Sequence, residues 1–374
     1  MTRKLKIGYL TSSLSNQGGW DRYSKGLIKS MAKLAEVSVL TRRDARNDNL
    51  DGIKIYPVLP VKDNSFNPKI QASVFFKVRE YLKDRDVIHN LIEPYAPGAA
   101  LAARSNGIKF FLTFHGTYAI PPKGLSPKNF LKRNMMRIMY RLASISTTGS
   151  AKNAKLIEEV MPVGDWRFIP NGYDPEMFYH YGLEREPFLL TVGGVKPRKG
   201  VDIVIQALAL IKNEFPNLKY KIIGETESVP SFYGHLKDLI KKHGLEERVE
   251  FLGRVSDKEL RDFYNRCSIF VLSAQTREGA FEGFPMVFYE AQACGAPLIS
   301  TKGFGSEYVI KDGYNGFLTD ENDIIGTAEA IKKITGNPKV HNEMVKNSLV
   351  EAEKHTWDKI DLILMQMYED GLKK

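Results

Sequence analysis

Apolar positions along the chain follow two periods in alternation. Short apolar runs predict buried strands, and apolar positions spaced by three and four residues predict the helices between them. Strands are expected at 6–10, 37–41, 52–58, 86–91 and 109–114, with a weaker one at 144–148. Helices are expected at 22–34, 70–82 and 97–104 and from residue 151. Such alternation predicts a parallel sheet with helices on both faces.

The pattern stops near the middle of the chain and then restarts. Turn-forming residues without a sustained period run from Pro170 to Pro187. Strands are expected again at 188–192, 220–224, 249–252, 269–272 and 297–300, with helices from residues 201, 232, 257, 286, 324 and 338. The α/β fold predicted is two Rossmann-like, doubly wound domains facing across a cleft. Their bounds are 1–172, a linker at 173–187, 188–355, and a final helix at 356–374 that returns to the first domain.

Composition and charge narrow the choice of partners. The chain has 374 residues, 43% of them apolar and 26% charged, and a net charge of +10. Nucleic acid, an anionic membrane surface and small anionic ligands would all suit that charge. No zinc-finger spacing and no RNA-binding strand signature accompanies it, which disfavours nucleic acid. Cys267 and Cys294 are the only cysteines and lie in apolar patterns, so buried free thiols and a cytoplasmic protein are expected.

The most informative segment runs from Glu282 to Glu290. Pro285 suits the first position of the helix expected there, and Gly283 lets the backbone approach a ligand. The free N–H groups of a helix start bind anions. Two carboxylates beside an anion site fit a ligand that offers phosphate to the amides and hydroxyls to the carboxylates, such as a sugar nucleotide. Taken alone, either acid could be a solvated side chain. Glu278 is an alternative to Glu282 as the first carboxylate of the pair.

In each domain, a glycine-rich loop follows the first strand. Gly18 and Gly19 lie between the first strand and the first helix, where they form either a phosphate approach or a simple turn. Gly193–Gly200 carries Arg198 and Lys199, which suit a diphosphate clamp, with a solvated basic turn as the alternative. Neither loop matches the dinucleotide fingerprint or the P-loop spacing, so a dehydrogenase or a P-loop nucleotidase is not expected.

Two histidines and one basic segment are further candidates. His115 ends a strand, where it can reach a sugar hydroxyl or a phosphate oxygen, and a core histidine is the alternative. His89 has a similar place, and for it the structural interpretation is favoured. The segment 127–142 has cations at helical spacing with apolar residues between them. It is either an ordinary surface helix or a helix that meets an anionic membrane or a lipid-linked acceptor.

These motifs resemble those of the retaining glycosyltransferases of family 4, which have the GT-B architecture. The marks are Glu282 and Glu290 with their intervening residues, Ile169–Gly172, Phe251–Val255 and Asn315–Leu318, together with a last helix that carries Trp357. The resemblance runs nearly end to end. It implies an acceptor-side first domain and a second domain that binds the nucleotide sugar.

The resemblance also implies roles for single residues. Glu290 would bind the ribose, Glu282 the transferred sugar, Lys199 the diphosphate, and His115 the sugar from the first domain. The remaining donor-binding residues would be Gly18, Gly19, Arg198, Arg254, Val255, Gly283, Phe284, Pro285, Met286 and Val287. Arg254 and Val255 would lie near the base. Many members have an arginine where this chain has Gly194, and Arg198 is the candidate to replace it.

The expected activity is a metal-independent, retaining hexosyltransferase of glycan biosynthesis. A UDP- or GDP-sugar would be the donor, and the acceptor hydroxyl would be lipid-linked or part of a growing glycan. No cofactor is expected, and no metal-ligand spacing is seen in the sequence. The protein would be cytoplasmic, with 127–142 as its peripheral membrane contact. The alternatives are a nucleotide-sugar epimerase, a sugar phosphorylase and a non-catalytic sugar or polyanion binder.

Overall fold

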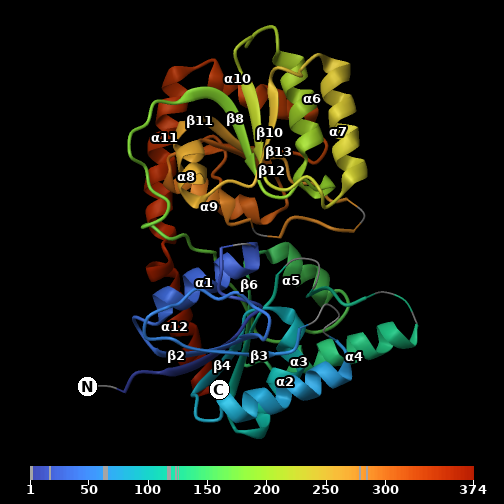
Figure 1. The fold of residues 1–374 in the computed structure, drawn as a ribbon, viewed down its shortest axis with the longest axis vertical. Helices are drawn as coiled ribbons and strands as arrows, with labels where there is room; N and C mark the ends of the chain where they lie inside the picture. Colours follow the sequence, from blue (N-terminus) through green and yellow to red (C-terminus); the bar gives the residue numbers. More distant parts are fainter. Residues whose placement is uncertain are drawn as a thin grey trace. The chain divides into compact units, whose positions relative to one another are not determined.

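The chain folds into two compact α/β units. The computed structural model describes residues 3–16, 18–61, 66–115, 119–122, 124, 126–277, 279–283 and 285–374. Unit 1 comprises residues 1–172 and 357–374, and unit 2 comprises residues 173–356 (Figure 1). Each unit has its own parallel sheet and its own buried apolar core.

Unit 1 is built on a seven-stranded sheet in the order β3-β2-β1-β4-β5-β6-β7, in which neighbouring strands pair in parallel. The strands are β1 Lys6–Leu10, β2 Glu36–Arg42, β3 Lys54–Leu59, β4 Val87–Asn90, β5 Lys109–Thr113, β6 Ile145–Thr148 and β7 Trp166–Phe168. The helices are α1 Gly19–Met31, α2 Pro68–Tyr81, the short 3₁₀ turn η1 Glu93–Tyr95, α3 Ala96–Ser105, α4 Pro127–Leu142, α5 Ala151–Glu158 and α12 Trp357–Lys373.

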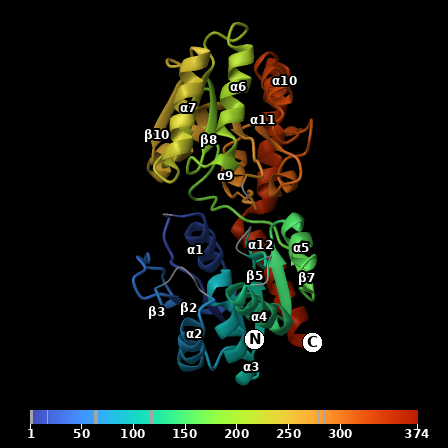
Figure 2. The same cartoon turned by 90° about the vertical axis from the view of Figure 1, so that its right-hand side faces the viewer.

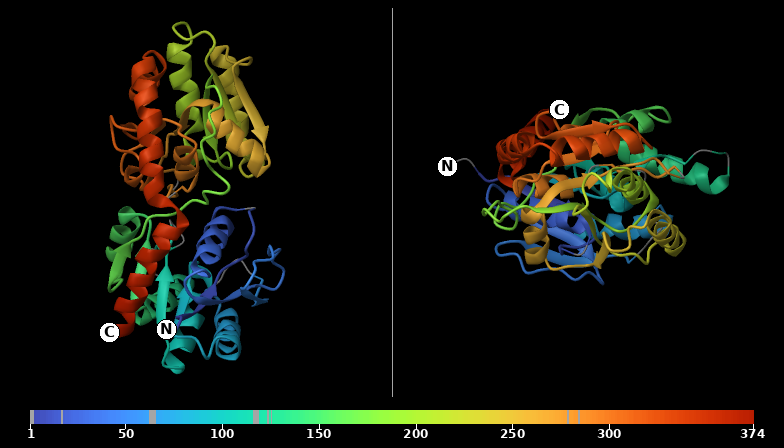
Figure 3. Two further views of the ribbon diagram at one scale, coloured as in Figure 1. Left: turned by 90° about the vertical axis from the view of Figure 1, so that its left-hand side faces the viewer. Right: turned by 90° about the horizontal axis from the view of Figure 1, so that it is seen from above.

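The last helix completes unit 1, although the whole of unit 2 precedes it in the chain. Helix α12 packs against α1 and runs beside the sheet, whereas α3 packs against both α2 and α4 (Figure 3). Trp357 fits between two glycines: a Cβ on Gly26 would lie 2.1 Å from its ring nitrogen, and a Cβ on Gly172 would lie 2.6 Å from its ring. The absence of side chains at these two positions therefore makes room for the indole.

Unit 2 repeats the plan with six strands in the order β10-β9-β8-β11-β12-β13. They are β8 Glu186–Val192, β9 Lys219–Ile223, β10 Val249–Gly253, β11 Cys267–Leu272, β12 Leu298–Thr301 and β13 Gly316–Thr319. The helices are α6 Val201–Ile211, α7 Pro230–His243, α8 Asp257–Arg266, α9 Val287–Ala293, α10 Ile324–Thr335 and α11 Pro338–Ala352, with 3₁₀ turns η3 Pro197–Lys199, η4 Gly305–Tyr308 and η5 Glu353–His355. Helix α6 lies beside α7 and α10 (Figure 2).

The predicted fold class, two doubly wound α/β domains with a returning helix, is confirmed. Two strands were missed. Strand β7 has only three residues, all half-buried, and β13 has only four residues and begins with glycine, so neither shows an apolar run. Within the described residues, no helix has both the length and the apolar character needed to cross a bilayer.

Candidate functional site

Two loops of unit 2 meet at the point where the strand order of its sheet reverses. Strand β8 lies between β9 and β11, and ligands of doubly wound sheets bind at the carboxyl ends of such strands. The loop after β8 carries Arg198 and Lys199, and the loop after β11 carries Glu282. Nζ of Lys199 lies 2.8 Å from Oε2 of Glu282, and Nε of Arg198 lies 3.3 Å from the same oxygen.

Glycine allows the first loop to reach the second. Gly200 has φ +64°, and a Cβ there would lie 1.8 Å from the carbonyl oxygen of Ser273. The backbone N–H of Gln275 donates to the carbonyl of Arg198 at 2.9 Å. These contacts hold the loop that follows β8 against the end of β11, and thereby bring both cations to Glu282.

The cluster combines burial with charge. Lys199 is 8% exposed and Glu282 9%. Burial acts to raise the pKa of Glu282, but the charges of Lys199 and Arg198 outweigh it and hold the pKa below its ordinary value. The carboxylate is therefore ionised at neutral pH. Two cations for one carboxylate leave an excess of positive charge that suits an anionic ligand.

Glu290 lies in α9, and the start of this helix differs from the prediction. The helix begins at Val287, with Met286 at its N-cap, so Pro285 precedes the helix and Glu290 lies in its first turn. Glu290 is 2% exposed, and the hydroxyl of Tyr264 donates to its Oε2 at 3.0 Å. Burial of a carboxylate requires hydrogen-bond partners, and Tyr264 supplies one.

The structure describes most of the other predicted residues of this segment. Gly283 and Val287 are half-buried, and Pro285 is buried. The carbonyl of Gly283 accepts a hydrogen bond from the N–H of Gly305 at 3.1 Å. Phe284, like Glu278, lies outside the described residues.

A second ionic group lies at the ends of β9 and β10. Nη2 of Arg254 lies 3.0 Å from Oε2 of Glu225, and the hydroxyl of Ser228 donates to the other carboxylate oxygen, Oε1. A Cβ on Gly194 would lie 3.3 Å from Glu225, so this carboxylate borders the space that the missing side chain leaves. Val255 follows Arg254 and is half-buried.

Three predicted residues belong to unit 1. Gly18 is the N-cap of α1 and Gly19 its first residue. His115 follows β5, and its Nε2 lies 2.9 Å from the carbonyl oxygen of Leu91. Because a carbonyl only accepts, Nε2 carries the proton and donates it to Leu91. Burial lowers the pKa of His115 to about 4, so the ring is neutral near pH 7.

His89 has the structural role that was favoured for it. It is fully buried, and its two ring nitrogens lie 2.6 Å from the hydroxyl of Tyr368 and 2.8 Å from that of Thr113. Burial lowers the pKa of His89 to about 3. The histidine therefore ties α12 to the sheet of unit 1.

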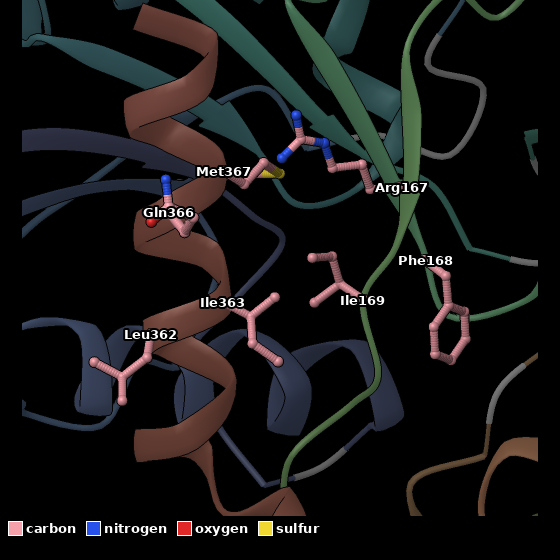
Figure 4. A pocket seen from close by; sticks show the side chains of 7 residues that line it. All are labelled: Arg167, Phe168, Ile169, Leu362, Ile363, Gln366 and Met367. Carbon is pink, nitrogen blue, oxygen red and sulfur yellow. The ribbon is translucent and has the colours of Figure 1, made fainter.

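Unit 1 also has a cavity of about 420 Å³ between α12 and the end of β7. It is lined by Arg167, Phe168, Ile169, Leu362, Ile363, Gln366 and Met367. Ile169 faces Ile363 and Met367, and Phe168 points away (Figure 4). None of the predicted site residues lines this cavity, so it is separate from the candidate site.

The sequence interpretation missed Tyr264 and Glu225. Tyr264 belongs to the buried face of the amphipathic helix α8, where a tyrosine has the signature of an ordinary core residue. Glu225 is the second residue after β9 and follows Gly224, a position that could have drawn attention, because ligands bind at strand ends.

Comparison with known proteins identifies the class and then the family. The fold matches that of the Anabaena protein HepE in complex with UDP-glucose, with a TM-score of 0.77, 18% identity and coverage of 98% of this chain and 100% of that one. The two-unit fold is thus that of the GT-B glycosyltransferases. The model of Glycosyltransferase Family 4 matches residues 17–177, and that of Glycosyl transferases group 1 matches residues 175–349. The chain belongs to this family of glycosyltransferases.

Two curated relatives illustrate the range of the family. An uncharacterized glycosyltransferase of Methanocaldococcus jannaschii is 29% identical over 76% of this chain and 75% of its own length. A GDP-mannose-dependent phosphatidylinositol monomannoside mannosyltransferase of Mycolicibacterium smegmatis is 27% identical over 47% of this chain and 45% of its own length.

Proposed function

We propose that this glycosyltransferase moves a hexose from a UDP- or GDP-sugar to an acceptor hydroxyl, with retention of anomeric configuration and without a metal ion. The observation that carries the proposal is the convergence of Arg198 and Lys199 on Glu282 at the switch point of unit 2. A diphosphate leaving group gains negative charge as its bond to the sugar breaks, and fixed cations stabilise that charge. The neighbouring carboxylate suits the hydroxyls of the sugar.

The proposed mechanism assigns each group a step. Lys199 and Arg198 bind the diphosphate, and Glu282 accepts hydrogen bonds from hydroxyls of the transferred sugar. Glu290, held by Tyr264, binds the ribose. The bond between the anomeric carbon and the phosphate oxygen breaks, and the acceptor oxygen attacks from the same face. The leaving phosphate takes the acceptor's proton, so that no separate protein base is needed.

The names of two similar proteins support the choice of donor. The Anabaena neighbour binds UDP-glucose, and the mycolicibacterial relative is GDP-mannose-dependent. Within unit 2, Arg254 and Val255 are assigned to the base, and the backbone of Gly283, Pro285, Met286 and Val287 to the sugar and phosphates. From unit 1, Gly18, Gly19 and His115 are assigned to the phosphates and the sugar.

The test measures nucleoside diphosphate release from UDP- and GDP-hexoses with and without acceptor alcohols. We expect nucleoside diphosphate to be released only when an acceptor is present. The anomeric configuration, measured by NMR, should be the same in the product as in the donor. EDTA should not change the rate of transfer. Isomerised donor without acceptor would identify an epimerase instead, and phosphate consumption would identify a phosphorylase. An inverted anomer would contradict retention, and loss of turnover in EDTA would contradict metal independence.

For the acceptor, the proposal is a lipid-linked hydroxyl at the cytoplasmic face of an anionic membrane. On α4, Phe130 is 62% and Leu131 44% exposed, and Lys128, Arg137 and Arg141 are exposed beside them. Exposed apolar side chains among cations are typical of helices that lie on anionic bilayers. The protein should sediment with vesicles that contain phosphatidylglycerol and not with pure phosphatidylcholine vesicles.

A matched pair of variants tests that surface. Phe130→Ser should reduce vesicle binding, whereas Ile325→Ser, which removes a 70% exposed apolar side chain from α10, should leave it unchanged. Equal binding of both variants would remove α4 from the proposal.

A further inference from the structure

The ends of β4 and β5 are tied together through one residue. The backbone N–H of His115 donates to Oε1 of Glu93, and the imidazole Nε2–H of His115 donates to the carbonyl of Leu91 at 2.9 Å. Leu91 and Glu93 both belong to the segment that follows β4. Main chain and side chain of His115 are thus both held by the neighbouring strand end, and the direction of the ring is determined.

The second ring nitrogen is consequently an acceptor. A neutral imidazole has one N–H, and the contact to Leu91 places it on Nε2. Nδ1 therefore carries a lone pair, and none of the described residues donates a hydrogen bond to it. The rings of Trp20 and Tyr23 lie against the imidazole, with centroids 6.2 and 4.9 Å away. His115 is only partly buried.

Glu93, which accepts the backbone N–H of His115, is an unusual residue for a buried position. It is fully buried, and its Oε2 accepts no hydrogen bond from the described residues. Burial raises the pKa of Glu93 to about 8, against the N–H of His115 and the charge of Lys132, which lower it. Around neutral pH the group is mainly an uncharged acid, whose carbonyl oxygen can accept the N–H as an amide oxygen would.

We propose that Glu93 is a positioning residue that fixes His115 in the tautomer whose Nδ1 can accept a hydrogen bond from a hydroxyl of the bound ligand. The identity of that hydroxyl rests on the proposed function, whereas the fixing of the ring does not. Because the role requires an acceptor oxygen and no charge, glutamine can fill it and alanine cannot. This separates a positioning residue from an ionised catalytic group.

The first experiment observes the ring in the full-length protein without donor. In ¹⁵N-histidine-labelled protein, the His115 resonances are assigned by their loss in His115→Asn. The wild type and Glu93→Gln should show a single neutral tautomer protonated at Nε2. Glu93→Ala should show averaging between tautomers, and Val78→Ala, which opens a cavity in the same core, should not. An unchanged His115 spectrum in Glu93→Ala would overturn the proposal.

The second experiment measures transfer kinetics. Glu93→Ala should lower kcat/KM for the donor about 10- to 100-fold, as expected for a misplaced contact. Glu93→Gln and Val78→Ala should remain within about 3-fold of the wild type. Equal losses in Glu93→Gln and Glu93→Ala, or no loss in either, would overturn the proposal. An absence of transfer by the wild type would contradict the proposed function instead, and the spectra of the first experiment would then decide on the positioning role.

Discussion

The ammonium of Lys199 and the carboxylate of Glu282 lie 2.8 Å apart, and each residue is less than one tenth exposed. Burying a lone charge is costly, so each requires the other when the site holds no ligand. An anionic ligand that attracts Lys199 and Arg198 would compete with Glu282 for them. The carboxylate would then be available to hydroxyl groups of the same ligand. Phosphate and sugar recognition are therefore coupled through one ion pair.

The first prediction concerns the cation of this pair. Lys199→Ala should lower kcat about 10²- to 10³-fold, the effect typical of removing one group that stabilises charge developing on a leaving group. It also leaves Glu282 with Arg198 as its remaining cation, so the melting temperature should fall. Steady-state kinetics with saturating donor and a thermal melt measure the two effects. Lys302→Ala, which removes an exposed partner of Asp320 at 3.2 Å, is the control and should change neither.

The second prediction asks whether Arg198 replaces the side chain absent at Gly194. Arg198→Ala should raise KM for the donor and lower kcat, less severely than Lys199→Ala because Arg198 is more exposed. Gly194 has no left-handed backbone angle, and the atoms nearest to a Cβ there belong to the flexible side chains of Glu225 and Lys196, so a side chain can be introduced without backbone strain. Gly194→Arg in the Arg198→Ala background should restore part of the activity. Wild-type kinetics in Arg198→Ala would show that Arg198 does not replace the missing side chain.

The third prediction concerns pH. The charges of Lys199 and Arg198 hold the pKa of Glu282 below 4.5 in spite of its burial. A carboxyl group whose pKa is depressed by folding stabilises the folded state above its unfolded pKa, and that contribution is lost as the pH falls through the folded value. Below about pH 5, stability should therefore fall more steeply with pH in the wild type than in Glu282→Gln. Parallel curves of melting temperature against pH would show that Glu282 carries no such contribution.

How far the sequence predicts this site depends on what each residue displays in its local pattern. Strand β11 is buried throughout, and its apolar run predicts both the strand and the loop that carries Glu282. Because parallel strand ends share one edge of a sheet, that loop and the loop with Lys199 could be assigned to one site. The direction of each side chain depends on packing. The ion pair and the contact from Tyr264 to Glu290 therefore could not be predicted from the sequence. Pro285 was expected at the first helical position but precedes α9, because proline suits the position just before a helix as well as the first turn.

The fourth prediction uses two glycines of unit 2 with the same backbone angle. Gly200 has φ +64° and Gly244 has φ +62°. Alanine at either position incurs about 1–2 kcal/mol of backbone strain. At Gly244 the new Cβ has room, whereas at Gly200 it would lie 1.8 Å from the carbonyl oxygen of Ser273. Gly200→Ala should therefore destabilise unit 2 by about 2–4 kcal/mol and also impair turnover, because the loop that carries Lys199 must move. Equal melting temperatures for the two variants would contradict the role given to the close approach.

The fifth prediction separates nucleoside binding from chemistry. Tyr264→Phe removes the hydroxyl that donates to Oε2 of Glu290 at 3.0 Å. The hydrogen bond that holds Glu290 in place contributes about 1 kcal/mol, which the variant loses. The ribose does not change during transfer. If Glu290 binds it, the variant should lose the same binding free energy in the ground state and in the transition state. KM for the donor should therefore rise about 5-fold with kcat unchanged. Tyr220→Phe removes another buried tyrosine hydroxyl of unit 2, the one 2.8 Å from Thr191 Oγ1, and should leave KM as it is. A fall in kcat at constant KM in Tyr264→Phe would instead place Glu290 at the reacting sugar, and the roles assigned to Glu282 and Glu290 would have to be exchanged.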